Sequence, residues 1–213
     1  MHAYVFLTEG AVAPLSGFVL PTPKDGEQGA WVNTATAPGE TLRGCKVGDL
    51  PYWLDDELWN IELAGTLVER GHLILAGRAR LLSRIDTWVD QLAWEFVATC
   101  ARRVVQRAAA ALRDAGRADA AASLEEAGDL EELELAANAA ADQPGHAQTL
   151  AGYVADVCFY ARDAGVPARG ACVAAKMSAY AVAATVEDVH GFDERLANER
   201  AWQAAWLVDR LGL

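Results

Sequence analysis

Carboxylates that could carry chemistry gather near residue 56, where Asp55, Asp56 and Glu57 are consecutive and Glu62 follows shortly afterwards. Carboxylate oxygens bind divalent cations and transfer protons, so this group is typical of metal-dependent and acid/base enzymes. Adjacent residues on a helix point about 100° apart, and at most two of the three consecutive acids could share one ion. With a phenol from the second half of the chain, the candidate catalytic residues are Asp56, Glu62 and Tyr160. The alternative is a solvated helix end, because exposed acids are common.

Glu187 and His190 form a candidate metal-ligand pair. The spacing Glu-x-x-His places both side chains on one helical face, as in di-iron carboxylate bundles, where a second pair and two further carboxylates complete the site. Gly191 is expected to end the helix directly after this pair, and a histidine at such an end would interact favourably with the helix dipole. Both interpretations stay open, and we predict no cofactor.

The segment 119–134 is strongly acidic, and neither Lys nor Arg occurs between residues 119 and 160. Such a run is typical of a solvated helix face, or of a docking surface for a basic partner or a nucleic-acid mimic. We predict that a basic protein partner would contact four of these acids, Glu125, Glu126, Glu131 and Glu132.

The chain has 213 residues, a formal net charge of -12 and an isoelectric point near 4.7. Nucleic acids and anionic membranes are themselves negative, so this charge argues against binding to either. Four cysteines are widely spaced without a CxxC pair, as expected of buried thiols in a reducing compartment. The first residues lack the basic and apolar regions of a signal peptide, and no apolar run is long enough to span a membrane. We therefore expect a cytoplasmic protein.

Residues 49–63 are predicted to form a short helix followed by a strand. Asp49 can accept amide hydrogen bonds as the cap of a helix over residues 51–57. Pro51 is tolerated in the first turn of such a helix, where its missing amide needs no partner. Apolar and polar residues then alternate from Trp59 to Leu63, which indicates a half-buried strand that Gly65 ends. Residues 73–85 predict a longer strand with strict alternation throughout. The first 85 residues are thus predicted to be a small, mostly antiparallel sheet with one short helix.

From residue 86 the composition changes to Ala, Leu and Glu, with apolar residues at helical spacing. We predict helices over residues 86–115, 118–127, 130–141, 148–164, 167–186 and 193–211. The chain is therefore expected to be an α+β protein with a β-rich domain over residues 1–85 and a helical bundle over residues 86–213. An exposed alanine-rich face could also hold two copies together as a homo-oligomer.

Two segments resemble known families. The sequence LRGCKVGDLPYWL, with WNIELAG after it, resembles a small uncharacterised domain of phage and bacterial proteins. The helical half, with CARRVVQRAAAALRDAG and ERAWQAAWLVDRLGL, resembles helical bacterial immunity proteins of toxin systems. Neither family supplies catalytic residues to carry over. The resemblance implies a bacterial, cytoplasmic protein that binds another protein.

The arrangement of a loop, a short helix and a Glu-bearing strand also resembles small ADP-ribosyltransferase-like folds. The resemblance implies that Glu62 would be the catalytic Glu and that His2 or Tyr4 would be the His or Tyr expected earlier in such a fold. The leading hypothesis is a protein-binding module, immunity-like or anti-toxin-like, without catalytic chemistry of its own. The alternative is a small enzyme of unknown reaction with a pocket between the sheet and the helical bundle.

Overall fold

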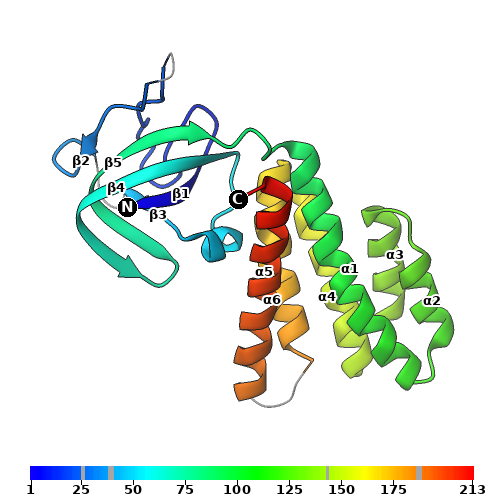
Figure 1. Cartoon of the computed structure of the whole chain (residues 1–213). Helices are drawn as coiled ribbons and strands as arrows, with labels where there is room; N and C mark the ends of the chain where they lie inside the picture. The colour runs from blue at the N-terminus through cyan, green and yellow to red at the C-terminus, as the bar shows by residue number, and fades with distance from the viewer. Residues whose placement is uncertain (25–26, 38–40, 143, 186–188) are drawn as a thin grey trace. The chain divides into compact units, whose positions relative to one another are not determined.

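The computed structural model describes residues 1–24, 27–37, 41–142, 144–185 and 189–213, and for residues 189 and 190 it describes the backbone alone. An antiparallel sheet precedes a helical region, which confirms the predicted α+β class (Figure 1). Contacts divide the chain into two compact units. The sheet unit comprises Met1–Val89 with Ala204–Leu213, and the helical unit comprises Asp90–Gln203.

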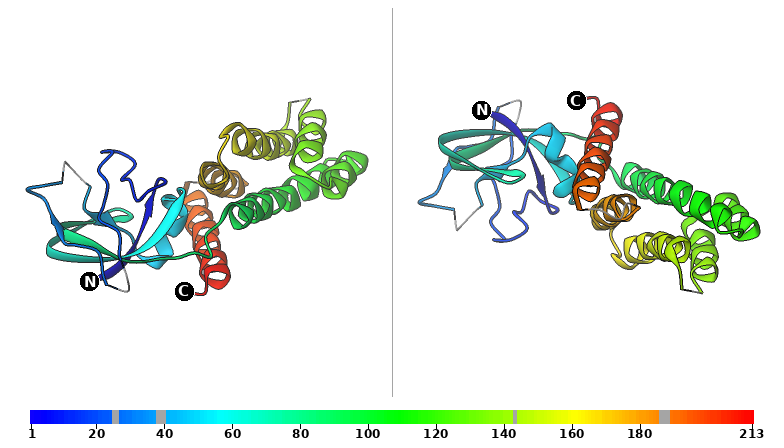
Figure 2. Two further views of the ribbon diagram at one scale, coloured as in Figure 1. Left: turned by 90° about the horizontal axis from the view of Figure 1, so that it is seen from above. Right: turned by 90° about the horizontal axis from the view of Figure 1, so that it is seen from below.

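The described residues of the sheet unit form five strands, whose pairings are all antiparallel. These are β1 (His2–Leu7), β2 (Val32–Asn33), β3 (Arg43–Gly44), β4 (Glu57–Arg70) and β5 (Leu73–Arg84). β1 pairs with β4, β4 with β5, and β5 with both β2 and β3. Tyr4 and Cys45 exchange backbone hydrogen bonds of 3.0 and 2.7 Å, which link β1 back to the residue after β3. The pairing therefore closes on itself, and Figure 2 shows the matching curvature of β4 and β5.

The core of the sheet unit lies on the inner face of this curved sheet. The predicted alternation in β4 is confirmed, because Trp59, Ile61 and Leu63 are buried while Asn60 and Glu62 are only half-buried. The buried residues that form this core come from all five strands or their loops: Ala3, Val5, Leu7, Ala11, Ala13, Leu20, Val32, Ala37, Leu42, Trp59, Ile61, Leu63, Ile74, Ala76, Ala79 and Leu81.

A bulge at Gly65 overturns two of the predictions for these strands. Instead of ending there, β4 continues to Arg70, and the register jumps between the pairs Ala64↔Arg78 and Leu67↔Ala76. Gly65 has a φ of +78°, a conformation that glycine adopts without a steric penalty. The inward positions of β5 change phase at the same place, from 74 and 76 to 79 and 81. Strict alternation along β5 was therefore a wrong prediction.

The predicted helix over residues 51–57 is also wrong. The chain instead forms a 3₁₀ helix, η1 (Val47–Tyr52), and Glu57 already belongs to β4. Asp49 does not cap it: its Oδ1 lies 2.8 Å from Nδ1 of His72 in the β4–β5 hairpin. The Tyr52 ring stacks on the His72 ring with centroids 3.5 Å apart. Contacts with this hairpin, rather than a helical cap, thus hold η1.

The helices are α1 (Asp90–Asp114), α2 (Ala118–Glu126), α3 (Leu130–Ala140), α4 (His146–Asp163), α5 (Pro167–Ala183) and α6 (Val189–Leu211). The predicted end of the first helix near residue 115 and the predicted start of the third at residue 130 are confirmed. Gly116 follows α1 with a φ of +76°, and the Asp129 carboxylate caps α3. α1 starts later than predicted, because the Trp88 indole donates to the Asp55 carbonyl at 2.8 Å and residues 86–87 form a turn. Gly191 does not end a helix but lies inside α6.

Small residues let the helices of the helical unit approach closely. α1, α4 and α5 pack against one another, while α2 contacts α1 and α3 contacts α4 (Figure 1). A Cβ atom on Gly170 of α5 would lie 2.6 Å from the Ala161 carbonyl oxygen of α4, so only glycine fits there. In the described part of the chain, no helix has the length and apolar character needed to cross a membrane.

Three of the four thiols are deeply buried. Cys45, Cys100 and Cys158 have 1, 0 and 0% of their surface exposed, whereas Cys172 is half-buried, and all four are free of disulfides. Burial raises the pKa of each of the three from 9.0 to about 12. With Ellman's reagent at pH 8, we expect Cys172 to react first and the other three only after unfolding.

The same burial predicts a loss of stability at alkaline pH. Above pH 9 the unfolded chain releases thiol protons that the folded chain keeps up to about pH 12, so this contribution is complete below pH 9 and is lost as the pH rises. We expect roughly 1 kcal/mol per buried thiol at pH 10. Urea unfolding at pH 7.5 and 10 would measure it. Cys158→Ala should reduce the pH dependence, whereas an equal reduction in Cys172→Ala would contradict the assignment.

Candidate functional site

The three predicted catalytic residues have separate structural partners. Asp56 and Glu62 belong to the sheet unit and Tyr160 to the helical unit. Asp56 Oδ2 accepts the Glu9 amide at 3.2 Å. Glu62 accepts a hydrogen bond of 2.7 Å from Arg80, which lowers the pKa of its carboxyl group, so Glu62 is ionised at neutral pH. Tyr160 is exposed on α4 beside Phe159, at a centroid distance of 5.2 Å. The structure thus does not bring the two carboxylates onto a common partner.

The candidate metal pair falls outside the described side chains, because Glu187 is not among the described residues and His190 is described by its backbone alone. Glu69 and His72 have the same spacing, but Glu69 pairs with Lys46 at 2.8 Å and His72 with Asp49. Among the residues that the structure describes, no three His, Cys, Asp or Glu side chains gather closely enough to hold a metal ion.

The four predicted partner-binding acids lie on α2 and the start of α3, and we call Glu125, Glu126, Glu131 and Glu132 the acidic surface. Glu125 pairs with Arg113, and Glu132 accepts the Gly128 amide at 2.8 Å. Glu126 is exposed, and the Glu131 side chain is 71% exposed at 3.6 Å from Arg162. The acidic surface therefore combines two carboxylates with structural roles and two that project into solvent.

A hollow of about 300 Å³ adjoins this surface, between α1 and the α2–α3 connection. Leu124, Leu130 and Leu133 contribute to its apolar lining. Glu125 and Asp129 contribute carboxylates, and Arg102 of α1 contributes one positive charge. Asp129 accepts the amides of Glu131 and Glu132 at 2.9 Å each, so this connection has a defined conformation. The hollow could accept an apolar side chain of a ligand whose flanking positive charges meet the acids.

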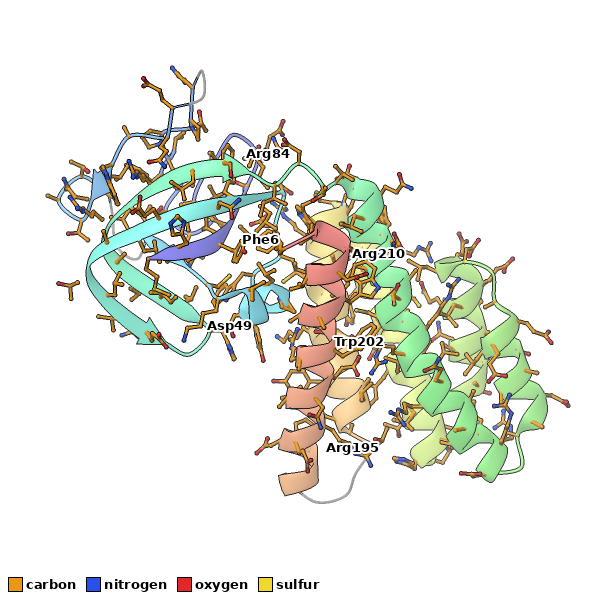
Figure 3. The ribbon with its side chains drawn as sticks, in the orientation of Figure 1. Phe6, Asp49, Arg84, Arg195, Trp202 and Arg210 are labelled. Carbon is orange, nitrogen blue, oxygen red and sulfur yellow. The ribbon has the colours of Figure 1, made fainter. Side chains whose placement is uncertain are left out.

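A buried polar network lies between α1, α5 and α6, and the sequence patterns did not predict it. Both carboxylate oxygens of Glu199 accept hydrogen bonds of 2.6 Å from Arg103. The Arg103 guanidinium lies 3.9 Å from the ring centroid of Trp202, which Figure 3 labels on α6. Gln203, which is fully buried, donates to the Ala175 carbonyl at 2.9 Å and to Ser178 Oγ at 3.1 Å. These groups satisfy one another, which makes the network structural.

Helical spacing contained the signal for this network. Glu199, Gln203, Leu207 and Leu211 follow one another at intervals of four, so the first two continue a stripe whose last two members are buried. A polar residue on such a stripe is expected to need a buried partner. The arginines of α1 lacked an equivalent signal, because cationic side chains on a helix are usually solvated.

Comparison with known proteins finds no matching family model, no matching curated protein and no matching solved structure. The geometry of the described residues therefore carries the functional argument.

Proposed function

We propose that this chain is a protein-binding module without catalytic chemistry of its own, and that its acidic surface and the adjoining hollow bind a basic segment of a partner. The observation that carries this proposal is the hollow lined by Leu124, Leu130 and Leu133 beside carboxylates. The resemblance of the helical half to bacterial immunity proteins favours a cytoplasmic partner of the toxin class.

The apolar hollow and the acids around it indicate which side chains a partner would need. Buried anchors supply most of the free energy of association at protein interfaces, whereas charged rims determine specificity and association rate. A segment with one aliphatic anchor flanked by Lys or Arg would fill the hollow and meet Glu126 and Glu131. Both carboxylates are exposed, so pairing with a partner requires no rearrangement of the fold.

Reversing these two charges should strongly weaken the interaction without unfolding the protein. For Glu126→Lys with Glu131→Lys, we expect roughly 100-fold weaker binding, because like charges facing each other at an interface cost several kcal/mol. The free energy of unfolding should change by less than about 1 kcal/mol, since only the exposed contact with Arg162 is lost. Including Glu125 and Glu132 in the reversal should abolish binding, at a larger cost in stability because of their structural contacts.

The partner would first be identified by native mass spectrometry of the tagged chain from its own host, then purified and titrated calorimetrically. A matched control is Asp193→Lys with Glu194→Lys, two exposed acids near the start of α6. Undiminished affinity in the Glu126/Glu131 variant, or equal losses in both variants, would refute the proposal. Sedimentation of the chain alone tests whether a second copy is the partner.

A further inference from the structure

An open cavity of about 740 Å³ lies in the helical unit and shares Gln106 with the hollow lined by the three leucines described above. The C-terminal half of α1, the start of α4, Thr185 and Arg195 of α6 line it. A smaller hollow of about 230 Å³ shares Arg107 and Arg195 with it. Sites for small molecules typically have about 300 to 1,000 Å³, so the cavity is large enough for a metabolite.

Two exposed arginines of this lining, Arg107 and Arg195, have no carboxylate partner among the described residues. Among the described residues, neither Arg107 nor Arg195 has an acidic group within ion-pair distance, whereas the neighbouring Arg103 is neutralised by Glu199. Arg195 donates one hydrogen bond to the neutral Thr185 hydroxyl, so four of the five N–H donors of its guanidinium group are not used in this bond. Asp114 is the acid of the lining, and it pairs with neither arginine. The cavity is therefore locally positive in a chain whose net charge is -12.

The start of α4 adds positive potential to the same cavity. Gly145, His146 and Ala147 line it, and no side chain of the described residues caps this helix. The Thr149 amide makes the first bond of the helix, to the Gly145 carbonyl, and the first amides of a helix have no acceptor within the helix itself. The start of α4 and the two arginines therefore line one cavity.

We propose that this cavity binds a small molecule that carries a phosphate or diphosphate group, with Arg107 and Arg195 bonding its oxygens. Guanidinium groups present planar pairs of donors that match phosphate oxygens, and two of them offer more donors than a single carboxylate can accept. Ala110, Ala111 and Leu150 supply an apolar wall for the remainder of the ligand. None of the four acids of the acidic surface lines this cavity, and Gln106 is the residue it shares with the adjoining hollow.

Calorimetric titration of the full chain with inorganic pyrophosphate, in metal-free buffer of constant ionic strength, tests the proposal. We expect saturable binding that weakens at least about tenfold in Arg107→Gln and in Arg195→Gln, because each substitution removes charge-assisted hydrogen bonds. Arg169→Gln is the matched control, since Arg169 is exposed on α5 and lies outside the lining, and its affinity should stay within about twofold.

Ala110→Glu offers a second variant that leaves both arginines in place, because an added carboxylate at this exposed position of the lining should repel the ligand. Circular dichroism would verify that each variant is folded. The absence of saturable binding, an equal loss in Arg169→Gln, or tighter binding of citrate than of pyrophosphate would each overturn the proposal.

Discussion

Glu57→Ala is expected to lower the free energy of unfolding of the sheet unit by about 3 kcal/mol or more, because the Glu57 carboxylate is buried and joins four donors. Its oxygens accept the amides of Gly10 and Ala11 at 3.2 and 3.0 Å, the Trp59 indole at 3.0 Å and Arg84 at 3.2 Å. Removing the carboxylate leaves these donors without their acceptor, and an unsatisfied buried donor costs about 1 to 3 kcal/mol.

The same carboxylate holds a strained turn. Ala11 has a φ of 58°, a left-handed conformation that costs a residue with a Cβ atom about 1 kcal/mol or more. The amide of Ala11 donates to Glu57 Oε2, so the native turn depends on this acceptor. Without it, we expect the turn around Gly10 to relax and the adjoining part of the sheet to loosen.

Urea unfolding followed by tryptophan fluorescence would measure the effect of Glu57→Ala. The control is Glu69→Ala, because Glu69 lies on the same strand and pairs with Lys46 at 2.8 Å while remaining 62% exposed. An exposed ion pair contributes less than about 1 kcal/mol, so this control should unfold almost as the wild type does. Equal effects of the two substitutions would show that the burial of Glu57 has no energetic role.

Glu199→Ala is expected to destabilise the helical unit by about 3 kcal/mol, because it removes one partner of a largely buried ion pair. The Glu199 side chain is 1% exposed and that of Arg103 is 29% exposed. Without the carboxylate, the guanidinium keeps its charge and its contact with the Trp202 ring but loses both hydrogen bonds. The comparison is Glu125→Ala, whose pair with Arg113 is exposed and should contribute less than about 1 kcal/mol.

A double variant distinguishes the loss of the pair from the cost of the unpaired charge. Replacing Arg103 and Glu199 together by leucine removes the charge as well, so it should destabilise the protein less than Glu199→Ala does. Urea unfolding followed by circular dichroism at 222 nm reports on the helices. If the double variant is the less stable of the two, the unpaired guanidinium is not the main source of the loss.

Local patterns in the sequence were sufficient to predict the fold class and most helix ends. Gly116 and Asp129 act on their own neighbours, through left-handed backbone freedom in the first case and amide capping in the second. The alternation from Trp59 to Leu63 likewise indicates one buried face whatever strand lies beside it. Such signals depend only on nearby residues, which is why they could be predicted.

Tertiary structure decided the features that depend on a distant partner. The bulge at Gly65 changes which residues of β5 face the core, and only the pairing of the two strands reveals it. Glu57 was one of three similar acids in the sequence, but the turn at Gly10 and Ala11 makes it the buried one. Arg107 and Arg195 are 88 positions apart and become neighbours only because α1 and α6 line one cavity. Composition and periodicity determined the elements of this protein, whereas burial and charge at its candidate sites depend on long-range contacts that no local pattern encodes.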